Sequence, residues 1–289
     1  MPDCPIIDTH VHFWNNDQAA IDWVADIPAL NRAFEPGDLT EEAAGVDVEG
    51  LIFVEAAVND GAQLDEVAWV AQLAQTDRRF LGIVAHAPVH LGAAVRAHLD
   101  ALAEIKLVKG VRRLLQQESD PAFCLSDDFL EGVRTVGEVG LHFEICVVHP
   151  QLAHAAEMVR RCPEVSFVLN HIGKPDIKNG LTDPWRNDLK DLAACPNAFC
   201  KLSGVATEAD LEGWTESQLR PYVDHTLQCF GPDRTMFGGD WPVSKLALSY
   251  PRWTEIVDAA LADYTGEDIE KIYGGNAKRI YRTDDIAFI

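Results

Sequence analysis

The stretch PIIDTHVHF, residues 5–13, joins an apolar, β-branched start to two histidines that stand two positions apart. Its first half is typical of a buried strand. Seven further short runs of this kind follow: GLIFVEA from residue 50, FLGIVAHA from 80, LVKGVRRLL from 107, LHFEICVV from 141, VSFVLNHIG from 165, AFCKLSGV from 198 and TMFGGDWP from 235. The sequence therefore predicts eight strands.

Segments with helical spacing of apolar residues separate these runs, as in Leu64, Val67, Ala68 and Ala71 after the second. Strands joined by a helical crossover are normally parallel, and eight such units favour a closed (β/α)8 TIM barrel of the α/β class. An open dinucleotide-binding sheet would need a GxGxxG turn after the first strand, where the chain instead reads HFWNND. Since no linker divides the chain, we expect one domain over residues 1–289.

Composition excludes several classes of partner. The net charge of −22 over 289 residues would repel phosphate backbones, so we expect no nucleic-acid partner. No apolar run reaches the roughly 18–20 residues that cross a bilayer, so we expect no membrane partner. The N-terminus lacks the basic and apolar regions of a signal peptide, which predicts a cytoplasmic protein. The seven cysteines form no paired framework and are expected to be small buried hydrophobes.

Ionisable residues stand at the ends of the predicted strands, where the active site of a barrel of this kind lies. His10 and His12 end the first strand, His171 ends the sixth and Asp240 ends the eighth. Alternation places His10 and His12 on one face, where they could be metal ligands, hooks for a substrate or core residues. With His171 and Asp240, they form a donor set suited to one divalent metal, zinc above all, with room for a water molecule.

Strands four and five add candidates for substrate binding. Glu144 shares the inward face of its strand, because Phe143, Ile145 and Val147 form an apolar set suited to lie under helices. Either Arg112 or Arg113 can face the site at regular geometry, and the sequence leaves open which one does. An arginine here could bind a carboxylate or several hydroxyl groups.

Further candidates lie near the same rim. Glu55, Trp14 and Trp241 could shape the substrate pocket, and His86 and Lys174 are weaker candidates. The remaining histidines outside the predicted strands are expected to be solvated on loops or helices: His90, His98, His154 and His225. The segment KNGLTDPWRND, residues 178–188, follows the sixth strand and is expected to contribute to selectivity near the mouth.

Five stretches resemble the amidohydrolase superfamily, in particular its amidohydrolase 2 branch: IDTHVHFW at 7, KGVRRLLQQESD at 109, FVLNHIGKP at 167, CPNAFCKLSGV at 195 and FGPDRTMFGGDWPV at 230. They span nearly the whole chain. The resemblance is greatest to fuconolactonase-like and rhamnonolactonase-like enzymes. It implies a TIM-barrel hydrolase that opens a sugar-derived lactone to its hydroxy acid, with a small-molecule lactone as partner.

The resemblance implies that Asp240 acts as general base and acid, and we expect His171 to be a second catalytic residue. His10, His12 and His171 would hold the metal or bind the lactone carbonyl directly, since members of this branch differ in metal dependence. Alternatives on the same barrel are a lactone isomerase, a metal-dependent decarboxylase and a muconolactone- or pyrone-type lactonase. The sequence leaves the oligomeric state open between a monomer and a homo-oligomer.

Overall fold

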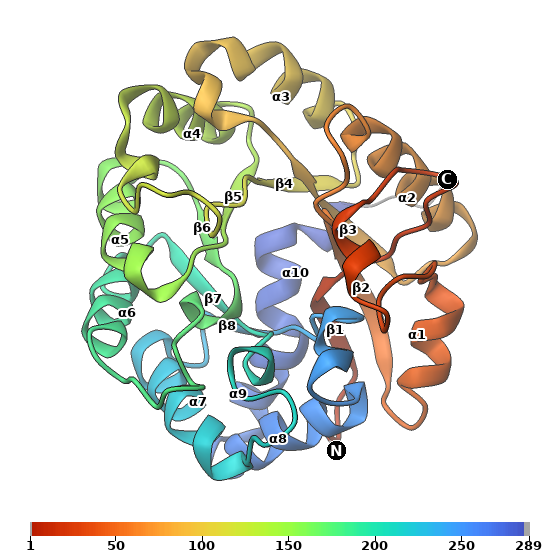
Figure 1. Ribbon diagram of the computed structural model, residues 1–289, viewed down its shortest axis with the longest axis vertical. Helices are drawn as coiled ribbons and strands as arrows, with labels where there is room; N and C mark the ends of the chain where they lie inside the picture. Colours follow the sequence, from red (N-terminus) through yellow and green to blue (C-terminus); the bar gives the residue numbers. More distant parts are fainter. Residues whose placement is uncertain (1, 286–289) are drawn as a thin grey trace.

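The computed structural model of the chain describes residues 2–285 and contains one sheet of eight parallel strands in the order β1 to β8 (Figure 1). The strands are β1 (Ile6–Val11), β2 (Val48–Val54), β3 (Phe80–His86), β4 (Val108–Arg112), β5 (His142–Ile145), β6 (Phe167–Leu169), β7 (Ala198–Leu202) and β8 (Thr235–Phe237). Each lies within or overlaps one of the runs predicted from the sequence. The prediction of a (β/α)8 barrel is confirmed.

The sheet closes between its first and last strands at the two histidines, His10 in β1 and His12 directly after it. The amide N–H of His12 donates to the carbonyl of Trp241, and that of Asp240 donates to the carbonyl of His10, both at 2.7 Å. Val11 also pairs with Trp241 in a parallel bridge. This closure places Asp240 beside His10 and His12 although 228 positions separate it from His12 in the sequence.

The described residues form ten α-helices, of which α1 to α8 cover the outside of the barrel in the order expected for strand–helix units (Figure 1). They are α1 (Pro36–Glu42), α2 (Gln63–Thr76), α3 (Arg96–Ala103), α4 (Asp127–Glu138), α5 (Leu152–Arg161), α6 (Trp185–Ala193), α7 (Glu216–Phe230), α8 (Tyr250–Ala260), α9 (Gly266–Glu270) and α10 (Asn276–Tyr281). The outward faces of the strands pack against them in one large apolar core that includes Phe143 and Ile145, as predicted for strand β5.

A second, smaller apolar cluster fills the interior of the barrel below the site. It joins inward side chains of five strands to the C-terminal helix α10: Ile7, Ile52, Val54, Val84, Val168, Met236, Ala277 and Tyr281. Helix α10 lies at the centre of the ring of strands in Figure 1. Because this end of the barrel is filled, a substrate can reach the interior polar groups only from the opposite end, where the strands terminate.

The strand β1 departs from regular alternation between Asp8 and Val11. Ile7 belongs to the interior cluster and His10 also faces the interior, although three positions separate them. The irregularity therefore brings both the apolar plug and the histidine pair onto the inner face. Within residues 2–285, no helix has the length and apolarity needed to span a membrane.

Candidate active site

Three imidazoles surround one carboxylate at the C-terminal end of the barrel. Oδ1 of Asp240 lies 3.4 Å from Nε2 of His12 and 3.8 Å from Nε2 of both His10 and His171. All four side chains are almost fully buried. The strand ends predicted to meet do meet, and His10 and His12 point together as predicted.

The tautomer of His12 is fixed by the chain itself. Its Nδ1 lies 2.8 Å from the carbonyl oxygen of Val54, which only accepts, so Nδ1 carries the proton. In the neutral ring the lone pair of Nε2 then faces the carboxylate of Asp240 at 3.4 Å. Two acceptors at this separation repel each other unless a cation or a proton lies between them. The ligand atoms of His10, His12 and Asp240 all lie within 4.8 Å of one another, so this donor set fits one divalent cation.

His171 is placed differently from the other two histidines. Its Nδ1 lies 3.0 Å from Oγ of Ser203, which leaves Nε2 facing Asp240. It does not belong to the compact group formed by His10, His12 and Asp240. Its role as a metal ligand therefore stays a prediction, while its position against Asp240 suits contact with the reacting atoms.

Backbone strain is concentrated at this site. Six non-glycine residues among those described have a positive φ, and four of these line one cavity: Ala57, His171, Lys174 and Asp240. A non-glycine residue in this region costs on the order of 1–3 kcal/mol and persists only where its surroundings enforce it. The strain lies where side chains converge, which is typical of a functional site.

Burial and neighbouring charges set the protonation of the cluster. Burial lowers the pKa of His171 to about 3, against the opposing effect of the Asp240 charge. Burial also lowers the pKa of His10 well below its ordinary value, and the nearby Lys201 ammonium lowers it further. For Asp240, burial would raise the pKa, but His171 and His12 outweigh it and hold it below the usual value. Asp240 is thus a carboxylate at neutral pH, beside two neutral imidazoles.

The arginine left open by the sequence is resolved in favour of Arg112. Its Nε donates to Oε1 of Glu55 at 2.7 Å, one terminal nitrogen donates to the Glu55 carbonyl, and the other donates to Oδ1 of Asn170 at 3.2 Å. Both Arg112 and Glu55 line the cavity. Since these donors are already engaged within the protein, Arg112 has little capacity left for a substrate anion.

Glu144 faces the barrel axis as predicted but lies beneath the cavity and does not line it. Both of its carboxylate oxygens lie within 2.7 Å of Nζ of Lys201, and both side chains are fully buried. The side chains of Asn170 and Tyr281 also donate to this carboxylate. The position supports a role in holding the barrel interior rather than the expected contact with substrate.

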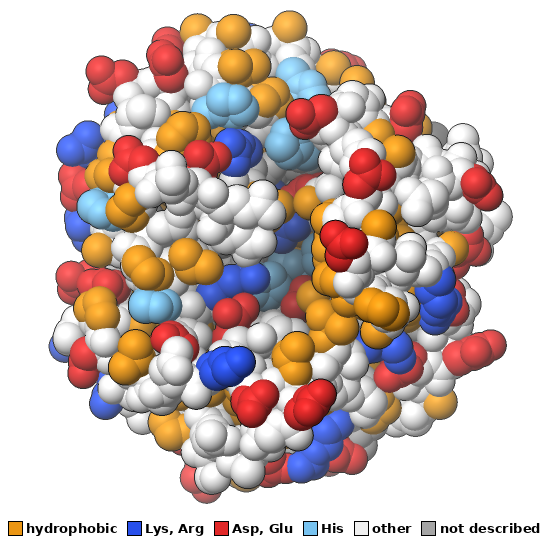
Figure 2. Space-filling view, in the orientation of Figure 1, with side chains coloured by type: hydrophobic (Ala, Val, Ile, Leu, Met, Phe, Trp, Pro, Cys, Tyr) orange, Lys and Arg blue, Asp and Glu red, His pale blue; other side chains and the backbone are white. Residues whose placement is uncertain are grey.

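The cavity above the cluster has a volume of about 450 Å³. Besides Arg112, its lining contains a second cationic side chain, which the sequence indicated only as a weaker candidate. Lys174 lines the cavity and pairs with Glu208 at 3.4 Å. Burial would lower the pKa of Lys174, but Cys146, Glu208 and Asp240 outweigh it and raise the pKa. Figure 2 shows the central hollow with histidine, basic and acidic side chains in it. Glu208 escaped the sequence analysis because nothing marks it locally; it follows β7 on the short turn Ala206–Glu208.

The two tryptophans expected to shape the pocket lie away from its lining. The indole N–H of Trp14 donates to backbone carbonyls of Leu30 and Arg32, and Trp241 packs between the rings of Phe13 and Phe34. Both side chains are buried, and they hold the first loop against the barrel. Trp23, on that loop, lines the cavity instead. The segment 178–188 contributes no residue to this lining.

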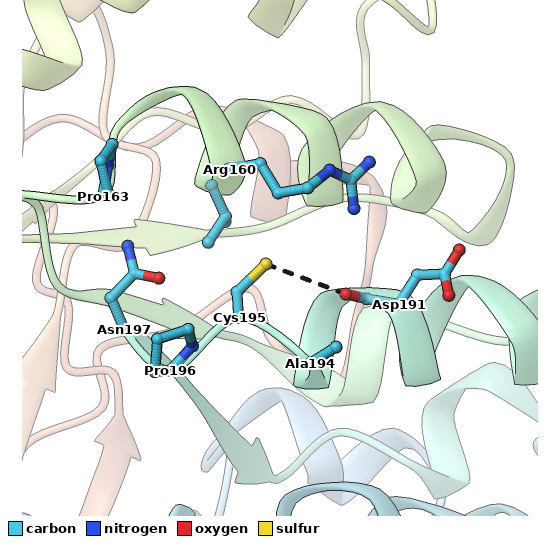
Figure 3. Close-up of a pocket in the computed structure, with 8 residues that line it drawn as sticks. Arg160, Pro163, Asp191, Ala194, Cys195, Pro196 and Asn197 are labelled. Atoms are coloured by element: carbon cyan, nitrogen blue, oxygen red, sulfur yellow. Dashed lines mark hydrogen bonds between the residues drawn. The ribbon is translucent and has the colours of Figure 1, made fainter.

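A pocket of similar size lies between α5 and α6 (Figure 3). Arg160 of α5 and Asp191 of α6 flank it, and Sγ of Cys195 contacts the Asp191 carbonyl at 3.8 Å. Part of its lining comes from the loops that lead into β6 and β7. These loops lie at the N-terminal ends of the strands. Catalytic residues of this fold lie at the C-terminal ends. Its position at the N-terminal ends of the strands therefore excludes this pocket as the catalytic site.

Comparison with known proteins identifies the family of the chain. Residues 7–283 match the family model described as amidohydrolase. The chain belongs to the amidohydrolase family. This match confirms the resemblance and the prediction of a hydrolase, and it spans every strand from β1 to β8.

Relatives with assigned activities cover nearly the whole of this amidohydrolase. L-Fucono-1,5-lactonase of Burkholderia multivorans is 33% identical, over 95% of each chain. L-Rhamnono-gamma-lactonase of Scheffersomyces stipitis is 24% identical, over 96% of this chain and 98% of its own. A crystal structure of a Burkholderia multivorans amidohydrolase with bound zinc superposes with a TM-score of 0.86 at 30% identity, covering 96% of this chain and 99% of its own.

Proposed function

We propose that this amidohydrolase opens the ester bond of a sugar-derived lactone and releases the corresponding hydroxy acid. The observation that carries the proposal is the Asp240 carboxylate beneath a cavity of about 450 Å³, within 3.8 Å of three imidazoles. Such a group can take a proton from water at neutral pH, because its pKa is held low. The lactonases among its relatives support a sugar lactone as the substrate class.

Asp240 would act twice in this reaction. It first accepts a proton from the attacking water as the oxygen bonds to the lactone carbonyl carbon. When the ring carbon–oxygen bond breaks, the same carboxyl returns the proton to the departing alkoxide, so that no proton donor beyond Asp240 is needed. Nε2 of His171 lies 3.8 Å from Oδ1 of Asp240 and would donate a hydrogen bond to the reacting oxygen.

His10, His12 and Asp240 are the residues that would hold a divalent metal, which we propose to be zinc. When bound, such a cation supplies positive charge that polarises the lactone carbonyl and acidifies water. We expect the purified protein to carry about one equivalent of zinc per chain, matching this single ligand group. Elemental analysis measures it, with His12→Ala expected to lose the metal and His154→Ala, outside the site, to keep it. Equal metal content in both variants would contradict the assignment.

Lys174 is the proposed partner of the negative charge that develops on the carbonyl oxygen. Its ammonium lines the cavity, whereas the donors of Arg112 are engaged within the protein. Glu208, at 3.4 Å, holds the lysine in place.

Replacing Lys174 by methionine is expected to lower kcat/KM by about 10²–10³-fold, as for loss of one donor to an oxyanion. Methionine keeps much of the side-chain volume, so the loss would report the charge. Lys178→Met, on the exposed stretch that follows, is the matched control. Steady-state kinetics on one aldonolactone compare the two variants, and similar values would remove Lys174 from the mechanism.

A pH-indicator assay with a panel of aldonolactones tests the proposed function. Hydrolysis of a lactone releases acid at neutral pH, so we expect indicator change with at least one member of the panel. A lactone isomerase would consume the lactone without net acid, and a decarboxylase would release carbon dioxide from an aromatic acid. Lactone consumption without acid, or activity on carboxylated aromatics alone, would replace the proposal by one of these alternatives.

A further inference from the structure

A second hollow adjoins the catalytic cavity, over the ends of β2, β3 and β4. It has a volume of about 670 Å³ and shares four lining residues with the catalytic cavity: Glu55, Ala57, Leu114 and Gln117. We call this second hollow the histidine groove, because His86, His90 and His98 line it. Figure 2 shows histidine side chains gathered beside the central hollow.

The three imidazoles come from one crossover and are half-buried, contrary to the expectation that His90 and His98 are simply solvated. His86 ends β3, His90 lies on the turn Val89–Val95 and His98 lies on α3. Nε2 of His98 contacts the carbonyl of His86 at 3.2 Å, which directs the ring. Nδ1 of His90 is shielded from solvent and has no hydrogen-bond partner among the described residues.

Among the described residues, the groove has no unpaired basic side chain in its lining. Arg113 lines it, but its guanidinium is paired with Glu118 and with the carbonyl of Leu114. Glu55 is paired with Arg112, and Asp60 adds a carboxylate at the rim.

His86 and His90 add no positive charge at neutral pH. Burial lowers the pKa of both His86 and His90, and the neighbouring Arg113 lowers each further. Neutral imidazoles both donate and accept hydrogen bonds. A lining of this kind suits hydroxyl groups better than phosphate or carboxylate.

The histidine groove lies beside the cavity in which the lactone ring would react. The reacting cluster lies over β1, β6 and β8, so a lactone whose carbonyl contacts Asp240 and His171 would extend past Glu55 toward β2 to β4. The two hollows adjoin at Glu55 and Leu114, which line both of them. A group attached to the lactone at its end remote from the carbonyl would enter the groove.

We propose that the histidine groove is a second sugar subsite, which binds a glycosyl unit carried by the lactone at a carbon remote from its carbonyl. The preferred substrates are then lactones of disaccharide aldonic acids. This subsite rests on the proposed lactonase function, since it assumes that the lactone ring occupies the catalytic cavity. The groove supplies neutral hydrogen-bonding groups for the second ring, while Pro88, Val58 and Leu114 supply apolar surface.

The kinetic test compares an aldonolactone with the same lactone carrying a pyranosyl group at the remote end. We expect His90→Leu combined with His98→Leu to lower the ratio of their kcat/KM values by about tenfold, the effect of losing one or two hydrogen bonds to hydroxyl groups. His154→Leu, on the outer helix α5, is the matched control and is expected to keep the wild-type ratio. A ratio that stays at the wild-type value in the double variant would overturn the subsite.

A binding measurement separates this subsite from the catalytic proposal. Calorimetry with the reduced disaccharide and the reduced monosaccharide, both neutral polyols, needs no turnover. We expect the wild-type protein to bind the disaccharide polyol at least tenfold more tightly and the double variant to lose that difference. Equal affinities for the two polyols, or inorganic phosphate binding that depends on His90, would overturn the sugar subsite even if the lactonase activity is found. If no lactone is hydrolysed but the disaccharide preference is present, the catalytic proposal fails and the subsite stands.

Discussion

Asp240→Asn is expected to lower kcat/KM for lactone hydrolysis by about 10³–10⁴-fold, toward the upper end of the effect of a positioned acid–base group. Asparagine fills nearly the same volume but cannot take a proton from water or return one to the alkoxide. The three surrounding imidazoles are buried, and two of them have lowered pKa values. We expect none of them to replace the carboxylate both as acceptor of the water proton and as donor to the alkoxide. The pH-indicator assay on the best lactone of the panel measures the loss.

Asp210→Asn provides the matched control, because Asp210 is an exposed carboxylate outside the cavity lining. It is expected to keep wild-type kinetics. Thermal unfolding of Asp240→Asn checks that the variant folds, since the side chain is almost fully buried. A folded Asp240→Asn protein with wild-type kcat/KM would show that another group activates the water.

The strands and their order were predictable because each strand carries its own signal. Short β-branched runs separated by helical spacing define eight parallel strands, and the fold then places the ends of all eight at one rim. His10, His12, His171 and Asp240 could therefore be predicted as neighbours despite their separation in sequence. Alternation on β5 also predicted that Glu144 faces inward, and the structure agrees.

Depth along the barrel axis was not predictable in the same way. Alternation decides which face a side chain takes but not whether its tip reaches the cavity or a lower layer. Glu144 lies in the lower layer, where Lys201 and Tyr281 contact it. Tyr281 belongs to α10 and stands 137 positions after Glu144 in the sequence. The directions of Trp14 and Trp241 depend equally on loop packing, which has no sequence period.

Local backbone conformation explains why the sequence indicated Lys174 only as a weaker candidate. Lys174 reaches the cavity because His171, Ile172 and Lys174 all have a positive φ. Among the residue types in this stretch, only glycine, at position 173, favours that conformation. A regular continuation of the chain would send the lysine elsewhere. Strained turns of this kind are imposed by their surroundings, so the stretch NHIGKP could mark the site but could not orient Lys174.

Lys201→Met is expected to lower the free energy of unfolding at pH 7 by about 3–5 kcal/mol, because it leaves the buried Glu144 carboxylate without its cation. The pair is fully buried, with Nζ within 2.7 Å of both carboxylate oxygens. Burial would raise the pKa of Glu144, and Lys201 outweighs burial to hold it well below the usual range. Denaturant unfolding at fixed protein concentration measures the difference, with Lys190→Met on the exposed face of α6 as the control.

The pH dependence of this loss follows from the same pair. In the wild type, the low pKa of Glu144 in the folded state contributes stability above the unfolded pKa of about 4.3, and this contribution falls as the pH drops below that value. Without Lys201, burial raises the folded pKa above the unfolded one, so the variant loses stability as the pH rises through this range. The difference between the two proteins is therefore expected to be largest near neutral pH and to shrink toward pH 4.

A second substitution distinguishes an unpaired charge from a packing defect. Glu144→Gln added to Lys201→Met removes the charge and keeps an acceptor for the Tyr281 hydroxyl, so we expect the double variant to recover most of the lost stability. A packing defect at position 201 would persist in the double variant. If the double variant is as unstable as Lys201→Met at pH 7, the ion pair does not determine the stability of the barrel interior, and the fit of the lysine side chain does.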